Sequence, residues 1–529
     1  MKKILKIQEK YNDPVTNIVL DTINIKKQAL VFCNTKKGAE AQAEKISLKI
    51  ISLDPNYKKI ADESLKALIN PTRQCKRLAQ CLEKGIAFHH AGLHSKQREL
   101  IENEFRKGTI KVICCTPTLA YGLNLPSFRT IVRDLKRYGH RGLTYIPTLE
   151  YHQIIGRSGR PDFNDEYGEA ITIAFSEGEK DKIKEIYING EIEKIYSKLA
   201  VEPILRTYVL SLIASEIVSD YNSLFDFFSK TFYAHQFKDI DKLKNLIGSI
   251  VAQLKEWKFI KKDKNDEKHF RNADELQKDK LEATFLGSRV SQLYIDPYTA
   301  YFIITCLERA NKNTKNQTFS YLQMLSSCLE LRPLLRVKTS EYDDIQAKLV
   351  EYESLLLMDE PSEYDDEEFN EFLSSIKTAL FFEDWINEND EEFLLEKYNI
   401  CPGEINAKLE ISDWLLYSAE EFAKILNYKI LIKDMVKLRF RLKYGAKEEL
   451  LSLLKLKNIG RVRARALYRN KIKSIIDVKN ADILILSHIL GKSLAIDIKK
   501  QVGEEHDPEK IKIKENKRRG QISLNYYNE

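Results

Sequence analysis

The sequence predicts an α/β domain followed by three largely helical regions. Up to about residue 195, short apolar runs alternate with helical patterns, as expected for a parallel sheet covered by helices on both faces. From about residue 196 the strand signal fades, and helical periodicity dominates as far as 440. Two short helical hairpins follow, with Gly460 and Gly491 at their turns. The expected domains are 1–195, 196–288, 289–440 and 441–503, with a charged, disordered tail over 504–529.

The strands of the α/β domain are expected where short apolar runs end in polar residues. These runs are 28–33, 111–115, 129–133 and 170–175. Asn34 and Thr35 follow the first run, and a helical pattern then continues to Lys49. Ligands bind in the crevice at the carboxyl ends of parallel strands, so the polar residues after these runs are candidates for a site.

The helical regions carry two features of their own. Within 196–288, several short helices are expected, and residues 257–262 should form a strand of a small wing, as in a winged helix. Residues 289–440 are expected to be all-helical, with the acidic run 364–369 between two helices. We interpret that run as a solvated surface and not as a magnesium site.

Composition restricts the class of protein. The chain has 529 residues and a net charge of +7, which permits nucleic-acid binding without requiring it. Its eight cysteines form no Cys-x-x-Cys pair, which favours reduced, buried thiols in a cytoplasmic protein over disulfides, zinc or an iron–sulfur cluster. There is no run of 18 apolar residues and no signal-peptide core, so neither membrane insertion nor secretion is expected.

The segment 151–161, Tyr-His-Gln-Ile-Ile-Gly-Arg-Ser-Gly-Arg-Pro, is the strongest indication of chemistry. It places Gln153 ahead of Arg157 and Arg160, on what we expect to be a short helix entered from a loop. Such an arrangement presents an arginine finger and a partner arginine to the terminal phosphate of ATP. The sequence has no Gly-x-x-x-x-Gly-Lys-[Ser/Thr] phosphate loop, and no Asp-Glu pair follows a strand as a magnesium-binding carboxylate would. The sequence therefore predicts one half of an ATPase.

Further polar residues in the same domain suit contacts with phosphate. Residues 89–93, His-His-Ala-Gly-Leu, read as a loop whose glycine permits close backbone approach, and Thr118 and Asn124 follow the second candidate strand. His90 and His94 stand four residues apart and could be interpreted as a metal pair. No carboxylate or cysteine completes that pair, which favours solvated or phosphate-contacting histidines.

The order and spacing of these segments resemble the second RecA-like domain of superfamily 2 helicases, and in detail the archaeal fork-repair DNA helicases related to the helicase half of polymerase theta. The resemblance implies that a first RecA-like domain binds most of the ATP and Mg²⁺. It also implies a duplex-splitting β-hairpin over 135–146, with Tyr138 either as the wedge or as an ordinary exposed aromatic. Residues implied near ATP are Gln153, Arg157, Arg160, Gly122 and Asn124, and those implied on the phosphates of the tracking strand are Thr35, His90 and Thr118.

Residues 447–503 resemble the helix–hairpin–helix module that closes members of this family. A glycine turn leaves backbone N–H groups pointing outward at a helix N-terminus, where a phosphate binds well. A helical hairpin with a solvated basic face is the alternative. The Gly-Lys-Ser run at 491–493 is not a phosphate loop, because Leu486 stands where the first glycine is required and no buried strand precedes it. The implied DNA contacts are Gly460, Arg461, Arg463 and Arg465.

The region 289–440 resembles the helical ratchet domain of the family, which begins at 293–297, Leu-Tyr-Ile-Asp-Pro. A long helix in it carries Trp414, which would stack on a base of the tracking strand. Packing in the core is the alternative, because two leucines follow. An arginine expected two turns earlier is replaced by Ala407, so either Lys408 substitutes as a point charge or the ratchet grips more weakly.

The resemblance implies the C-terminal part of an ATP-dependent helicase that moves 3′ to 5′ along single-stranded DNA and unwinds forked or branched DNA. A separate chain or a longer polypeptide would supply the first motor domain, and the isolated chain would not hydrolyse ATP. Two alternatives remain open, a non-catalytic DNA-binding adaptor and part of a Ski-type RNA helicase. The tail residues Gln521, Leu524 and Tyr527 have the spacing of peptides that bind sliding clamps, a spacing that chance also produces.

Overall fold

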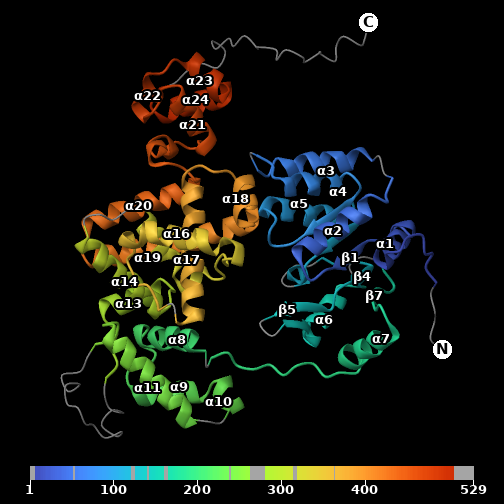
Figure 1. Cartoon of the computed structure of the whole chain (residues 1–529), viewed down its shortest axis with the longest axis horizontal. Helices are drawn as coiled ribbons and strands as arrows, with labels where there is room; N and C mark the ends of the chain where they lie inside the picture. Colours follow the sequence, from blue (N-terminus) through green and yellow to red (C-terminus); the bar gives the residue numbers. More distant parts are fainter. Residues whose placement is uncertain are drawn as a thin grey trace. The chain divides into compact units, whose positions relative to one another are not determined.

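The chain divides into two compact units (Figure 1). The computed structural model describes residues 6–51, 54–68, 70–120, 125–139, 142–159, 165–199, 201–237, 240–261, 280–313, 318–362 and 364–504. Unit 1 consists of Met1–Val201, Asp226–Leu243 and Asp390–Lys408, and unit 2 of Glu202–Phe225, Lys244–Asn389 and Leu409–Glu529. The segment Asp390–Lys408 thus belongs with the α/β part of the chain, from which it is distant in sequence.

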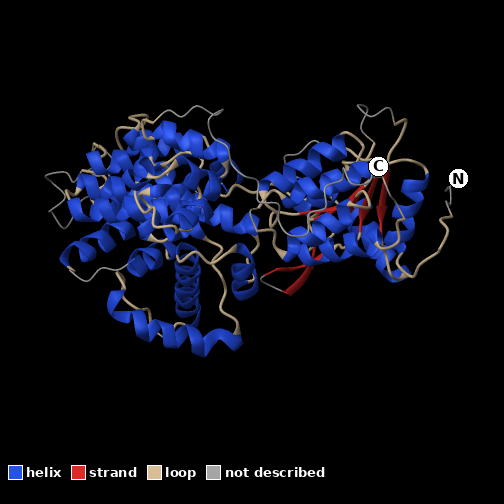
Figure 2. Ribbon diagram, turned by 90° about the horizontal axis from the view of Figure 1, so that it is seen from above, coloured by secondary structure: helices blue, strands red, loops and turns tan. Residues whose placement is uncertain are grey.

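Unit 1 is built on a five-stranded parallel sheet with the strand order β2-β3-β1-β4-β7. Its strands are β1 (Ala29–Phe32), β2 (Ile86–His89), β3 (Val112–Cys115), β4 (Arg129–Val132) and β7 (Glu169–Thr172). Strands β1 to β4 are buried along their whole length, as a sheet covered on both faces requires, and Figure 2 shows helices around them. The four predicted strands are confirmed. β2 has no predicted counterpart, because its four residues directly follow a helical pattern.

The first helices of unit 1 begin at side chains that accept a backbone hydrogen bond, which satisfies an otherwise unpaired N–H group. Asp13, Thr35, Asp54 and Thr72 cap α1 (Pro14–Asn24), α2 (Lys36–Ser47), α3 (Pro55–Leu65) and α4 (Arg73–Leu82) in that order. His94 caps α5 (Ser95–Arg106), its Nδ1 accepting from Lys96 N at 3.2 Å. This histidine therefore has a capping role that the sequence did not predict. The helices α6 (Thr148–Ile155) and α7 (Glu177–Ile183) follow.

The predicted hairpin is confirmed. β5 (Lys136–Gly139) and β6 (Gly142–Tyr145) pair antiparallel, with Tyr138 opposite Leu143. Residues 140 and 141 and the side chain of Tyr138 lie outside the part of the chain that the structure describes. Arg137 of β5 donates from Nη1 to Glu150 Oε1 at 2.9 Å, which ties the hairpin to α6.

Helices dominate residues 202–444. They include α8 (Glu202–Ala214), α9 (Tyr221–Ser229), α10 (Phe232–Phe237), α11 (Ile240–Glu256), α13 (Phe285–Gln292), α14 (Pro297–Lys312), α15 (Thr318–Ser326), α16 (Tyr342–Tyr352), α17 (Asp366–Ile386), α18 (Glu391–Tyr398), α19 (Pro402–Ile425) and α20 (Lys429–Tyr444). The predicted wing strand over 257–262 is shorter than expected in its described part, where Lys261 N donates to Glu282 O at 2.9 Å. Lys258 has a φ of +61°, which turns the backbone out of an extended strand, and only Ile260 forms an isolated bridge, with Ala283.

The sequence suggested that the acidic run 364–369 lies between two helices, but residues 366–369 belong to α17 itself. Asp365 caps α17, its Oδ1 accepting from Glu368 N at 3.2 Å, and residues 366–368 form the first turn of that helix. Negative charge is favourable at a helix N-terminus because the helix dipole is positive there. The run is therefore a helix start.

A small helical domain with its own apolar core closes the described chain. It contains α21 (Arg461–Arg469), α22 (Ile475–Asn480), α23 (Ile483–Leu490) and α24 (Lys492–Gln501). Gly460 caps α21, and Gly491, with a φ of +89°, joins α23 to α24. The second predicted hairpin is confirmed. In the first, the residues before Gly460 form only two 3₁₀ turns, Glu448–Leu450 and Leu453–Lys455, in place of the predicted helix. A helix precedes Gly491, so the run at 491–493 does not form a phosphate loop. The predicted tail lies outside the described residues.

Seven of the eight cysteines are buried, as the sequence predicted, and the eight are free in the structure. Within the described residues, no helix is both long and apolar enough to cross a membrane.

Candidate nucleic-acid and nucleotide site

A cavity of about 1040 Å³ lies in unit 1 beside the residues that follow β1 and β3, which are neighbouring strands. Thr35 caps α2, its Oγ1 accepting from Gly38 N at 2.9 Å, so its hydroxyl hydrogen can donate to a ligand. The Oγ1 of Thr118 lies 2.8 Å from Thr116 Oγ1. Thr35 and Thr118 are exposed and line the cavity. The structure thus brings these two predicted phosphate contacts together.

Charged side chains surround this cavity, and most of them are paired. The ion pairs are Lys36 with Glu404, Arg73 with Glu392 and Glu396, Arg77 with Glu40 and Glu44, and Arg137 with Glu150. Lys37 also lines the cavity and is exposed, and no residue in the described ranges forms an ion pair with it. The sequence analysis missed Lys37. Its place in the first turn of α2, two residues after Thr35, is the signal that could have identified it.

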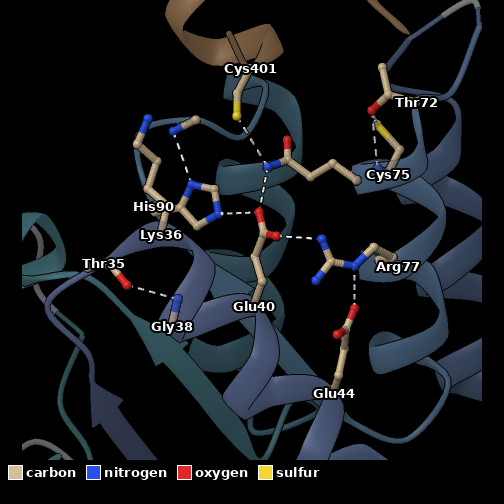
Figure 3. Close-up of polar contacts among 12 residues, drawn as sticks. Thr35, Lys36, Gly38, Glu40, Glu44, Thr72, Cys75, Arg77, His90 and Cys401 are labelled. Atoms are coloured by element: carbon tan, nitrogen blue, oxygen red, sulfur yellow. Dashed lines mark hydrogen bonds and ion pairs between the residues drawn. The ribbon is translucent and has the colours of Figure 1, made fainter. Parts of the chain in front are cut away.

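A buried carboxylate, Glu40 of α2, supports the cavity wall (Figure 3). Its Oε1 accepts from Gln74 Nε2 at 2.7 Å and lies 3.1 Å from His90 Nε2, and its Oε2 accepts from Arg77 Nη1 at 2.6 Å. Burial alone would raise the pKa of Glu40, but the hydrogen bonds from His90 and Gln74 and the charge of Arg77 lower it to about 2. Glu40 is therefore ionised at neutral pH and holds α2, α4 and the loop 89–93 together.

His90 is fully buried, which contradicts its predicted contact with phosphate. Its Nδ1 accepts from Gly92 N at 3.1 Å, so Nε2 carries the proton and donates to Glu40. Both ring nitrogens are thus used inside the protein. The next residue, Ala91, is exposed and lines the cavity, so this loop presents Ala91 and not an imidazole to a ligand.

The first turn of α19 packs directly on the same loop. Gly403 N donates to Gly92 O at 3.0 Å. A Cβ atom at residue 403 would come within 2.3 Å of the carbonyl oxygens of Ala91 and Leu93, far inside van der Waals contact. Only glycine permits this backbone approach, so Gly403 fastens the segment 390–408 to the α/β sheet domain.

Two of the predicted nucleotide-contacting residues, Gln153 and Arg157, lie near the end of α6. Gln153 is exposed in its last turn. The helix ends at Ile155, so Arg157 lies in the following turn and not on a helix as predicted. Arg157 donates from Nη2 to the carbonyl of Ala120, which ends the 3₁₀ helix (Pro117–Ala120) carrying Thr118. This bond joins the turn that carries Arg157, a predicted nucleotide contact, to the 3₁₀ helix that carries Thr118, a predicted contact to the DNA backbone.

Arg160, Gly122 and Asn124 lie outside the residues that the structure describes. Within the described ranges, no group of three or more His, Cys, Asp and Glu side chains is arranged to hold a metal ion.

The predicted ratchet residues differ in their accessibility. Lys408 is 9% exposed, and burial lowers its pKa despite the nearby carboxylate of Glu404. Ala407 is the residue that faces solvent. The alternative in which Lys408 substitutes as a point charge for the expected arginine is therefore wrong, because its side chain is buried. Trp414 is half-buried, and its Nε1 donates to Leu293 O at 2.9 Å.

The three arginines of α21 also differ. Arg463 is exposed and donates to Asn458 O at 2.8 Å. Arg461 lies with its Cζ 4.5 Å from the ring centroid of Trp385. Arg465 pairs with two carboxylates, its Nε at 2.8 Å from Glu388 Oε2 and its Nη1 at 2.6 Å from Glu449 Oε1. These pairs contradict the prediction that Arg465 is available to DNA, whereas Gly460 and Arg463 remain predicted contacts.

The parallel sheet, the polar cavity at its edge and the helical hairpins define the class of protein as a helicase motor domain joined to helical domains. Family models support this class. Residues 66–162 match the helicase conserved C-terminal domain, 168–261 a helix-turn-helix domain, and 319–445 domain 4 of archaeal helicases. The helix-turn-helix match begins just before β7, earlier than the predicted boundary at 196.

The chain belongs to the Hel308 family of ATP-dependent DNA helicases. It is 40% identical over 502 residues to ATP-dependent DNA helicase Hel308 of Methanococcus vannielii, covering 89% of this chain and 65% of that protein. For the protein of the same name from Pyrococcus abyssi, the identity is 38% over 525 residues, covering 98% of this chain and 69% of the relative. The chain thus spans about two thirds of the length of the curated relatives that it matches.

Proposed function

We propose that this chain is the C-terminal part of an ATP-dependent 3′–5′ DNA helicase that acts on forked or branched DNA in repair. The cavity beside Thr35 and Thr118 carries this proposal. Two hydroxyl groups after adjacent parallel strands, with the exposed ammonium of Lys37, offer donors to phosphates without reading bases. A translocating motor needs such a sequence-independent grip. The ATP-dependent DNA helicase activity named for the relatives supports DNA as the substrate.

In this proposal, ATP and Mg²⁺ are held mainly by a first RecA-like domain, and Gln153, Arg157 and Arg160 reach the terminal phosphate from the domain at 1–195. Gly122 and Asn124 contact the nucleotide. The exposed position of Gln153 supports this arrangement. The regions 196–288, 289–440 and 441–503 act as winged helix, ratchet and helix–hairpin–helix domains. The chain by itself binds single-stranded DNA but does not hydrolyse ATP.

Binding by the purified chain tests the DNA-handling part. Fluorescence anisotropy should show tighter binding to single-stranded DNA than to RNA of the same sequence. Lys37→Ala should weaken DNA binding and reduce the slope of log affinity against log salt by about 0.7, the value for one lost single-strand phosphate contact. Lys59→Ala is the matched control, because Lys59 is also exposed but lies on α3, outside the lining of this cavity. Tighter binding to RNA would instead favour the RNA helicase alternative.

Hydrolysis tests the motor part. DNA-stimulated ATP hydrolysis should appear when the chain is isolated from its own cells under mild conditions, and the recombinant chain alone should be inactive. Arg157→Ala and Arg160→Ala should abolish the activity of the native preparation. Inactivity of both preparations, with intact DNA binding, would favour the non-catalytic adaptor.

A further inference from the structure

Tyr294 presents a large aromatic ring to solvent. It is 83% exposed, and among the described residues its ring neither hydrogen-bonds nor stacks on another ring. Its backbone has a φ of +56°, just after the end of α13. Glycine or asparagine is favoured at such a left-handed position, and a bulky residue there is strained. Packing within the protein therefore does not explain a tyrosine here.

The backbone on both sides of Tyr294 is held in place. Leu293 O accepts from the indole Nε1 of Trp414 at 2.9 Å. The carboxylate of Asp296 accepts two hydrogen bonds from the buried Arg206, each 2.8 Å long, and Asp296 N donates to Glu330 Oε1 at 3.0 Å. The loop that carries the exposed ring is thus held in place by these hydrogen bonds. Stacking of a ligand on the ring therefore costs little conformational entropy of the loop.

Side-chain contacts of Arg289 also join α13 to the face of α19 that carries Trp414. Arg289 Nη2 lies 2.6 Å from Glu421 Oε2 and 3.3 Å from the hydroxyl of Tyr417. Trp414, Tyr417 and Glu421 stand three and four residues apart, which places them on one face of the helix. Tyr294 and Trp414 therefore belong to one continuous surface element of unit 2, connected through the carbonyl of Leu293.

We propose that Tyr294 stacks on a base of the single-stranded DNA next to the site of Trp414. This inference rests on the proposed function, because it assumes that the strand passes Trp414. A tyrosine offers a flat, rigid surface, and every nucleobase has a face that can stack on it, so the contact needs no particular sequence. Such a contact holds the strand through its bases, whereas Thr35, Thr118 and Lys37 hold it through its phosphates.

Anisotropy with two oligonucleotides of equal length, one bearing bases and one abasic, tests this role. Tyr294→Ala should weaken binding to the base-bearing strand roughly 5- to 100-fold, the range for loss of one stacked aromatic. Tyr294→Phe should bind as the wild type does, because the ring is kept. Tyr364→Ala is the matched control, because Tyr364 is fully exposed just before α17. The melting temperature of Tyr294→Ala should equal that of the wild type.

The abasic strand separates stacking from a general structural effect. Wild type and Tyr294→Ala should bind it equally, because there is no base to lose. An equal loss of affinity for both strands, or no loss for either, would show that Tyr294 does not stack on a base, while the proposed function would stand. If the wild-type chain bound no single-stranded DNA at all, both proposals would be wrong.

Discussion

Glu40→Gln should destabilise the domain that carries the candidate site. The carboxylate of Glu40 has three partners, Gln74, His90 and Arg77, and each presents an N–H group to it. A glutamine of the same size has only one acceptor oxygen, and its amide nitrogen would face a donor. The variant therefore loses at least one hydrogen bond to a charged acceptor and places two donors against each other in a buried site.

The magnitude follows from the titration of Glu40. Lowering its pKa from 4.5 to about 2 corresponds to about 3 kcal/mol of stability at neutral pH. Arg77 keeps Glu44 as a partner and its side chain is 39% exposed, so solvent screens part of this loss, and we expect roughly 2 kcal/mol. Because the pKa is lower in the folded state, this stability is complete above pH 4.5 and is lost as the pH falls through about 2.

Urea unfolding followed by far-ultraviolet circular dichroism measures this effect. The difference between wild type and Glu40→Gln should be largest at pH 7 and should shrink as the pH is lowered to 3. Glu44→Gln is the matched control, because Glu44 pairs with the same Arg77 but is 34% exposed, and it should cost less than about 1 kcal/mol. Equal losses for the two variants, or a difference that does not change with pH, would refute the assignment of Glu40 as the buried centre of this network.

Two further predictions concern other contacts of the structure. Gly403→Ala should lower the melting temperature by several degrees, because its Cβ would collide with two carbonyl oxygens, whereas Gly248→Ala, in the helix α11 and with open space around it, should leave the temperature unchanged or raise it. Equal melting temperatures for these variants in differential scanning calorimetry would contradict the tight backbone contact. Arg465→Gln should reduce the affinity for single-stranded DNA less than Arg463→Gln does, because two carboxylates already neutralise Arg465. The opposite order in anisotropy measurements would show that these ion pairs open on binding.

Local patterns in the sequence were enough to predict four of the five strands of the sheet, the β-hairpin and the turns at Gly460 and Gly491. Apolar runs that end in polar residues predict strands of a parallel sheet, whose carboxyl ends meet at one edge. For this reason Thr35 and Thr118, more than eighty residues apart in sequence, could be expected to share a site. The glycines at 460 and 491 indicated turns, but only Gly491, with a φ of +89°, uses the left-handed backbone that favours glycine, whereas Gly460 has a φ of −98°. The order of the motifs, which is a property of the sequence alone, indicated the family.

Tertiary structure alone decided which of the predicted polar residues face a ligand. His90 is buried because its partner, Glu40, comes from a helix fifty residues earlier, and no local pattern records such a pairing. Arg465 is neutralised by Glu388 of another helix end. Lys408 is buried and Ala407 exposed because the orientation of α19 depends on packing along its whole length. The periodicity of a sequence specifies which residues share a face, whereas long-range partners determine whether that face meets solvent, a ligand or the protein interior.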